Sequence, residues 1–185
     1  MDKKKKLGKI NQGIKNCRKC FLSRGAVFAV PGEGPIGSKI MFVGEAPGRE
    51  EDLTGRPFVG RSGKFLTKLI KAAGLKREKV FITSVIKHRP PKNRKPKKEE
   101  ISICFPYLEN QIKIIKPKTI VLLGQTAFSV FFPGKKLKDF RGKCITLRQA
   151  QGKQEFFVVY HPAAGIRFKK MKKIIEKDFR KLKGF

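Results

Sequence analysis

Long apolar segments are missing from this sequence of 185 residues. No apolar run approaches the roughly 18 residues that a membrane-spanning helix needs, so we expect no membrane segment. Residues 1–6 resemble the basic start of a secretion signal, but residues 7–12 supply no apolar stretch behind it. Secretion is therefore not expected, and we predict a cytoplasmic protein.

Acidic side chains are scarce as well. The chain has 14 Asp and Glu against 45 Lys and Arg, which gives a formal net charge of +31. A surface this positive repels itself unless negative charge is near, so we expect a polyanionic partner, with nucleic acid as the first candidate. The alternative is a lysine-rich surface suited to a cell with high internal salt.

Cysteine and histidine are few, with four and two residues. In an intracellular chain thiols stay reduced, so disulfide bonds are not expected. The cysteines are therefore either metal ligands or core thiols. Cys17 and Cys20 form a Cys-x-x-Cys pair at the end of a basic lead-in, residues 1–20.

Four apolar runs rich in β-branched and aromatic residues predict strands that are covered on both faces. The runs are 39–43, 80–85, 119–123 and 155–160. Segments with helical periodicity lie at 64–75, 99–115 and 168–182. This alternation predicts a three-layer α/β/α sandwich around a four-stranded, mainly parallel sheet, and the length fits a single domain, 1–185.

Gly, Pro and polar residues follow all four predicted strands. Ligands of an open parallel sheet bind beyond the carboxyl ends of its strands, so this edge is the predicted site. Gly and Pro also end strands for local reasons, which would explain any one of the four places. Such local reasons explain less well why the two histidines, His88 and His161, follow the second and the fourth predicted strand.

Four of the few carboxylates fall within eight positions after the first strand: Glu45, Glu50, Glu51 and Asp52. Carboxylates weaken DNA binding, so we expect a task for them, such as stabilising a cationic sugar or orienting water. Helix capping and loop solubility are the alternative, which we favour for Glu50.

Phe58 and Ser62 lie in the next turn-rich segment, 55–63. An aromatic ring in such a loop can stack on a base, although a phenylalanine is by default a core residue. Ser62 opens the following helix, where it could bind a phosphate or act as the N-cap.

Three motifs in order resemble the iron–sulfur uracil-DNA glycosylases of the thermostable type, family 4. The first is GEAPG at 44–48 with GRPFVG at 55–60, the second RPPKNR at 89–94 and the third YHPAA at 160–164. The resemblance extends from Cys17 to about Arg167. It implies an enzyme that flips uracil out of DNA and hydrolyses its N-glycosidic bond, leaving an abasic site.

The resemblance also implies roles for single residues. The backbone at Gly44, Glu45 and Ala46 and the ring of Phe58 would hold the flipped base. His161 would stabilise the leaving base anion, and Glu45 would position water or stabilise the sugar cation.

Further roles concern the DNA and the loops. Glu51 and Asn93 match a pair that latches the first motif to the middle loop. The segment from His161 to Arg167 would enter the duplex. The basic cluster at 87–98, Lys87 included, would hold the backbone. The residues expected to contact DNA are Arg61, Ser62, Arg89, Asn93, Arg94 and Arg167.

One departure concerns the 4Fe–4S cluster, which the family holds with four cysteines. Cys17, Cys20 and Cys104 match three ligands, and His88 stands at the place of the fourth. Histidine ligates iron–sulfur clusters in Rieske centres, so we predict a structural 4Fe–4S cluster with three cysteines and one histidine. A zinc site and a lost cluster are the alternatives. Cys144 falls outside the pattern and is predicted to be a core thiol.

The second departure is Ser84, at a place where the family often has an asparagine that reads uracil. A hydroxyl reaches less far and can donate or accept, so it discriminates less between bases. We still expect Ser84 to face the base and uracil to be the substrate, with hypoxanthine and xanthine as additional candidates.

The main alternative function is a non-catalytic nucleic-acid-binding protein of the same fold, which the changes at Ser84 and His88 favour. The intact Glu45, Phe58 and His161 favour an enzyme. A polymerase-associated phage module and a relative that becomes covalently trapped on DNA are less well supported. We expect a monomer that acts on uracil-containing DNA. A sliding clamp is a candidate partner, although no clear motif for one is present.

Overall fold

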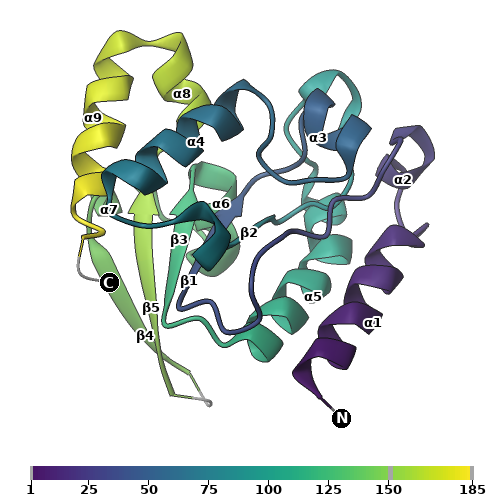
Figure 1. Cartoon of the computed structure of the whole chain (residues 1–185). Helices are drawn as coiled ribbons and strands as arrows, with labels where there is room; N and C mark the ends of the chain where they lie inside the picture. The colour runs from purple at the N-terminus through teal and green to yellow at the C-terminus, as the bar shows by residue number, and fades with distance from the viewer. Residues whose placement is uncertain (1, 150–151, 184–185) are drawn as a thin grey trace.

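A central five-stranded sheet organises the computed structural model, which describes residues 2–149 and 152–183 (Figure 1). The strand order is β2-β1-β3-β5-β4. The strands are β1 (Ile40–Gly44), β2 (Phe81–Ser84), β3 (Thr119–Leu123), β4 (Cys144–Gln149) and β5 (Gly152–Val159). Strands β2, β1, β3 and β5 run parallel, which confirms the predicted α/β fold.

Strand β4 is the fifth strand, so the predicted count of four was too low. It pairs antiparallel with β5 at the edge of the sheet. An edge strand of this kind alternates apolar and polar residues, as in Cys144–Gln149, and so it lacks the continuous apolar run of a central strand. Cys144 is exposed on β4, which makes the prediction of a core thiol wrong.

Helices precede, connect and follow the strands. They are α1 (Lys3–Lys15), α2 (Leu22–Gly25), α3 (Arg49–Thr54), α4 (Arg61–Ala72), α5 (Lys98–Ile115), α6 (Gln125–Phe131), α7 (Leu137–Phe140), α8 (Pro162–Arg167) and α9 (Lys169–Arg180), with 3-10 turns η1 (Arg77–Lys79) and η2 (Pro91–Asn93). The helices predicted at 64–75, 99–115 and 168–182 correspond to α4, α5 and α9. The short α8 was not predicted, because six residues are too few to show helical periodicity.

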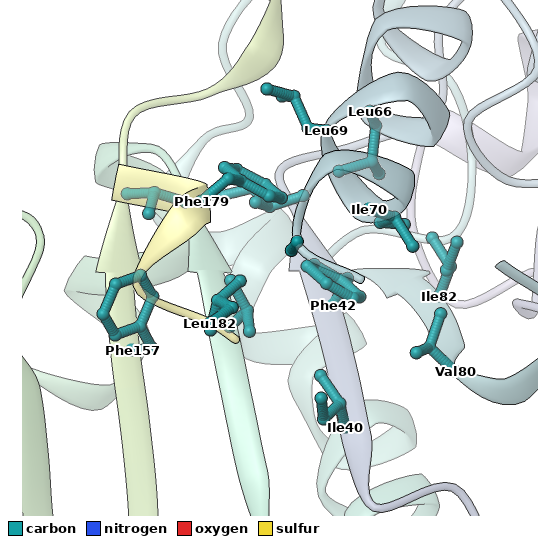
Figure 2. Close-up of a cluster of buried hydrophobic side chains, with 14 of the residues drawn as sticks. Ile40, Phe42, Leu66, Leu69, Ile70, Val80, Ile82, Phe157, Phe179 and Leu182 are labelled. Atoms are coloured by element: carbon teal, nitrogen blue, oxygen red, sulfur yellow. The ribbon is translucent and has the colours of Figure 1, made fainter. Parts of the chain in front are cut away.

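The helices form two layers over the sheet. On one face, α4 and α9 bury apolar side chains against β1, β3 and β5; Figure 2 shows Phe42 of β1 near Ile70 of α4 and Phe179 of α9. The rings of Phe42 and Phe179 stack with their centroids 6.0 Å apart. On the other face, α1, α5 and α6 cover the sheet. Each fully buried large apolar side chain contributes about 1.5–3 kcal/mol, so both layers hold the sheet firmly.

The carboxyl ends of the four parallel strands meet at one edge of the sheet. Gly44 of β1 lies in register with Ser84 of β2. The chain passes from β1 to its neighbour β2 and then returns to β3 on the other side of β1. The crevice beside β1 is therefore the place where a ligand is expected in an open parallel sheet. Within residues 2–149 and 152–183, no helix combines the length and the apolar character needed to cross a membrane.

Candidate active site

A cavity of about 710 Å³ opens at this edge of the sheet. It brings together most of the residues that the sequence singled out. Those that line it are Glu45, Ala46, Glu51, Phe58, Arg61, Ser62, Ser84, Asn93, Arg94, His161 and Arg167. Gly44 lies just below the cavity under Phe58, whereas Arg89 does not line it.

The buried carboxylate of Glu51 shapes the loop that carries Phe58. Its Oε1 accepts hydrogen bonds from the amides of Val59 and Gly60, both at 2.8 Å, and its Oε2 accepts one from Gly48 at 3.1 Å. Gly48 follows β1, and Gly60 precedes α4. One side chain therefore joins the two segments that form the wall of the cavity.

Two glycines allow Phe58 its position. A side chain at Gly44 would lie 2.5 Å from the Phe58 ring, and one at Gly63 would lie 1.9 Å from the Phe58 carbonyl oxygen. Phe58 itself has a left-handed backbone, with φ 51°. This conformation costs a residue other than glycine about 1–3 kcal/mol and persists only where surrounding contacts impose it, as Glu51 and the two glycines do here.

His161 is half-buried beside Phe58, and the two ring centroids are 5.7 Å apart. Its Nδ1 accepts a hydrogen bond from the Ala163 amide at 3.2 Å, at the start of α8. Burial lowers the pKa of His161 to about 4, although the charge of Glu51 opposes the shift. The ring is therefore neutral at pH 7, and because Nδ1 accepts, its proton lies on Nε2.

Glu45 and Thr126 meet across the crevice beside β1. The Thr126 hydroxyl donates a short hydrogen bond to Oε2 of Glu45. Thr126 is buried in the first turn of α6, directly after β3, whereas Glu45 follows β1. Thr126 was not among the site residues predicted from the sequence. Its position just after the third strand was the available signal, but one strand end does not show which side chain meets Glu45.

The middle loop, 89–94, differs from expectation in three contacts. The side chain of Asn93 accepts a hydrogen bond from Arg89 at 2.8 Å, and the carboxylate of Glu51 accepts hydrogen bonds from backbone amides. Among the described residues, no hydrogen bond therefore joins Glu51 to Asn93, the pair expected to latch the loop. Arg94 forms a bidentate ion pair with Glu100, at 2.6 and 2.8 Å. Arg94 therefore serves first to close the loop onto α5.

Lys87 was predicted to lie on the DNA-binding rim, and this prediction was wrong. The side chain is fully buried, and its Nζ donates to Thr83 Oγ1, to the Ser84 carbonyl and to Gln111 Oε1, at 2.6–2.8 Å. Burial lowers the pKa of Lys87 to about 7, and Cys104 opposes the shift. A basic run in the sequence cannot show that the side chain of one of its members points into the protein after β2.

Ser62 does not cap α4, which makes the N-cap alternative wrong. The helix begins at Arg61, and Gly60 is its N-cap. Ser62 lies inside the first turn and lines the cavity. Arg61, the first residue of the same turn, also lines the cavity, and the N-terminus of a helix favours an anion.

The predicted cluster ligands lie on the side of the molecule where α2 and α5 meet. Cys104 of α5 and Cys20 pack in one small apolar group with Ile86. Burial, and to a smaller extent Cys20 and Cys17, raises the pKa of Cys104 to about 11. Nearby, His88 is buried, and its Nε2 has no hydrogen-bond partner among residues 2–149 and 152–183.

These four side chains do not converge on one ion. Within the described part of the chain, no group of three or more His, Cys, Asp or Glu is close enough to hold a single metal ion. An iron–sulfur cluster takes each ligand on a different iron, so its ligands are spread more widely. The buried, unpartnered His88 Nε2 fits a ligand of such a group, because an unpaired buried polar atom is otherwise costly.

Comparison with known proteins identifies the family. The sequence model of the uracil DNA glycosylase superfamily matches residues 31–183. A type-4 uracil-DNA glycosylase of Sulfurisphaera tokodaii is 45% identical, covering 96% of this chain and 83% of that protein. The type-4 enzymes of Saccharolobus solfataricus and Pyrobaculum aerophilum are 46% and 44% identical, covering 92% and 93% of this chain and 82% and 90% of theirs. The chain belongs to the uracil DNA glycosylase superfamily, in its type-4 group.

The superfamily match covers the parts of the chain that build the cavity. It begins at Pro31 and includes all five strands. Cys17 and Cys20 precede it, so the superfamily match itself does not include the Cys-x-x-Cys pair. The cavity is lined by segments that follow β1, β2 and β5 and by the first turn of α4.

The protonation state of His161 can be tested directly. Because its pKa is about 4 against an ordinary 6.5, its ring signals in NMR spectra should stay constant from pH 8 to about 5 and shift only below that. The unfolded chain takes up this proton first, so its contribution lowers the free energy of unfolding as the pH falls from about 6.5 to 4. A His161→Gln variant assigns the signals. A midpoint between pH 6 and 7 would contradict the assignment of a neutral ring.

Proposed function

We propose that this chain excises uracil from DNA by hydrolysing its N-glycosidic bond, as the names of its type-4 relatives state for those proteins. The observation that carries the proposal is the convergence of Glu45, Phe58 and His161 in one cavity at the carboxyl edge of the sheet. The target bond is hidden inside a duplex, so the nucleotide must first rotate out into this cavity.

The flipped base would stack on Phe58, whose loop is held rigidly by Glu51 and by close packing on Gly44 and Gly63. Ser84 is buried at the cavity wall and offers a hydroxyl to the edge of the base. A hydroxyl donates to a carbonyl as readily as it accepts from an N–H. We therefore propose uracil as the main substrate and hypoxanthine or xanthine as secondary ones.

His161 would support departure of the base. As the bond between the sugar C1′ and the base N1 breaks, negative charge develops on the uracil ring. The neutral imidazole can donate its Nε2–H to this charge. Donors that are held in place before the reaction stabilise such charge most effectively, and the Ala163 amide holds the ring of His161 in place.

Glu45 would act on the sugar side of the bond. The sugar passes through a cationic, oxocarbenium-like state, which a nearby carboxylate stabilises. Among the described residues only Thr126 hydrogen bonds to the carboxylate, through Oε2, so Oε1 can accept a proton of the attacking water. The uracil anion leaves, the water oxygen bonds to C1′, and one proton of this water passes to Glu45.

The DNA strand would lie along the basic rim of the cavity. Arg61 and Ser62 stand at the start of α4, and Arg167 at the end of α8. Beside Arg167, Ile166 is 42% exposed and lines the same cavity. We propose that this end of α8 enters the space that the flipped nucleotide leaves.

A single-turnover assay on an oligonucleotide with one uracil tests the function. The wild-type chain should release uracil, and Glu45→Gln should lower the rate about 10²–10³-fold with DNA affinity within about threefold. Glu50→Gln, the same charge change on an exposed side chain at the same cavity, is the control and should keep the wild-type rate. Tight DNA binding without any base release by the wild type would favour the non-catalytic alternative.

The contact between Thr126 and Glu45 yields a separate prediction. Thr126→Val keeps the shape of the side chain and removes the hydroxyl, so Glu45 loses its anchor. We expect kcat to fall about tenfold with little change in KM, since the hydroxyl does not reach the base. Thr126→Ser should restore most of the rate. Equal rates for the valine variant and the wild type would refute the positioning role.

We further propose that Cys17, Cys20, His88 and Cys104 hold a 4Fe–4S cluster. The support is the packing of Cys20 and Cys104 in one small apolar group, the contribution of Cys20 and Cys17 to the raised pKa of Cys104, and the Nε2 of His88, which has no hydrogen-bond partner among the described residues. When bound, the cluster would supply a structural link rather than a reactant. The four residues would tie the segment after α1 to the middle loop and α5.

Anaerobic purification tests the cluster. The protein should absorb broadly at about 400 nm and contain iron and sulfide in equal amounts, because a 4Fe–4S cluster has as many sulfide ions as iron ions. His88→Ala should lose this absorption and His88→Cys should keep it. Cys144→Ser, an exposed cysteine outside the group, is the control and should also keep it. A colourless, zinc-loaded protein would instead establish the zinc alternative.

A further inference from the structure

A second cavity, of about 280 Å³, lies beside the active-site cavity between α4, α8 and α9. Arg61, Lys64 and Ile166 line both cavities, so the two adjoin each other. The proposed excision of uracil uses the first cavity only and assigns no role to the second.

Four cationic side chains line the second cavity. Arg61, Lys64 and Lys68 follow one another at spacings of three and four residues along α4, which places them on one face of the helix. Lys172 faces them from α9. Within the described part of the chain, none of the four forms an ion pair with a carboxylate. Like charges held this close favour an anionic ligand between them.

Gly165 brings the three helices together at this point. A side chain at Gly165 would lie 2.7 Å from the Phe65 ring, 3.2 Å from Ile175 and 3.3 Å from the Cα of Lys172. Helix α8 therefore packs directly on α4 and α9, and the cations converge on a cavity of defined shape. These four cations therefore differ from the lysines scattered elsewhere on the surface, because they line one cavity.

The lining also has an apolar part. Phe65 is half-buried and Ile166 is exposed, and both line the cavity among the cations. A free inorganic anion gains nothing from such contacts. A sugar–phosphate backbone does, because charged phosphates alternate with the less polar deoxyribose rings, and single-stranded nucleic acid is bound by basic grooves that also offer apolar surface.

We infer that the second cavity binds the phosphodiester backbone on one side of the flipped nucleotide, which sets a polarity on the bound strand. The inference rests on the proposed excision of uracil in the first cavity, since a strand whose flipped base lies in that cavity would run past the adjoining second one. Lys68 and Lys172 line the second cavity and not the first, so they are the residues that report on it alone.

The test compares a double variant, Lys68→Gln with Lys172→Gln, to a matched control, Lys9→Gln with Lys113→Gln. The control lysines are exposed on α1 and α5, in the layer on the opposite face of the sheet. Both variants lose the same charge. Two single-stranded substrates are used, one with nucleotides only on the 5′ side of a terminal uracil and one with nucleotides only on its 3′ side.

For the double variant we expect kcat/KM to fall about tenfold on one of the two substrates, through KM, and to stay unchanged on the other. The control variant should behave as the wild type on both. Equal losses on the two substrates, or equal losses in the control, would show a general effect of charge and overturn the inference.

Binding to a duplex with an abasic site provides a second measurement, which does not require base release. The slope of log Kd against log salt concentration should decrease by about 1.8 in the double variant, since each phosphate contact contributes roughly 0.9. An unchanged slope would also overturn the inference. If the slope decreases as expected in the double variant but the wild type releases no uracil, the proposed function fails while the inference about the second cavity holds.

Discussion

The three hydrogen bonds that Glu51 accepts from backbone amides are the constraint on which the site depends. Without that carboxylate, the amides of Gly48, Val59 and Gly60 would lose a charged acceptor, and each buried, unpaired amide costs about 1–3 kcal/mol. The left-handed backbone of Phe58 precedes two of these amides. The position of the aromatic ring, and hence the floor proposed for a base, follows from a carboxylate whose two oxygens both accept hydrogen bonds from backbone amides.

This division of labour extends to the other acidic side chains after β1. Asp52 is buried and accepts a hydrogen bond from the Val27 amide at 3.0 Å, so it anchors the loop before β1. Glu45 alone among them reaches across the crevice to another strand end, at Thr126. Of these carboxylates, Glu51 and Asp52 order the backbone by accepting hydrogen bonds from amides. Glu45 is the one to which we assign a role in the reaction.

Much of the fold could be predicted, because the four parallel strands are continuous apolar runs and the long helices have clear periodicity. Strand β4 could not, because residues 144–147 alternate between exposed and half-buried positions and so form no continuous apolar run. The members of the cavity could largely be predicted, because the carboxyl ends of parallel strands meet at one edge. Their partners could not: the sequence placed Lys87 with the exposed cations, whereas Thr83, Ser84 and Gln111 hold its ammonium group inside.

The sequence by itself determined the α/β class, the edge of the sheet at which the candidate site residues lie, and the net positive charge from which we expect a polyanionic partner. These properties follow from local composition and from the order of residues along the chain. Only the tertiary structure decided which carboxylate meets Thr126, that the ring of His161 is neutral, and that α4, α8 and α9 enclose a second cationic cavity. Those outcomes depend on distances between segments far apart in the sequence, and on the removal of water from around particular groups, which no local pattern encodes.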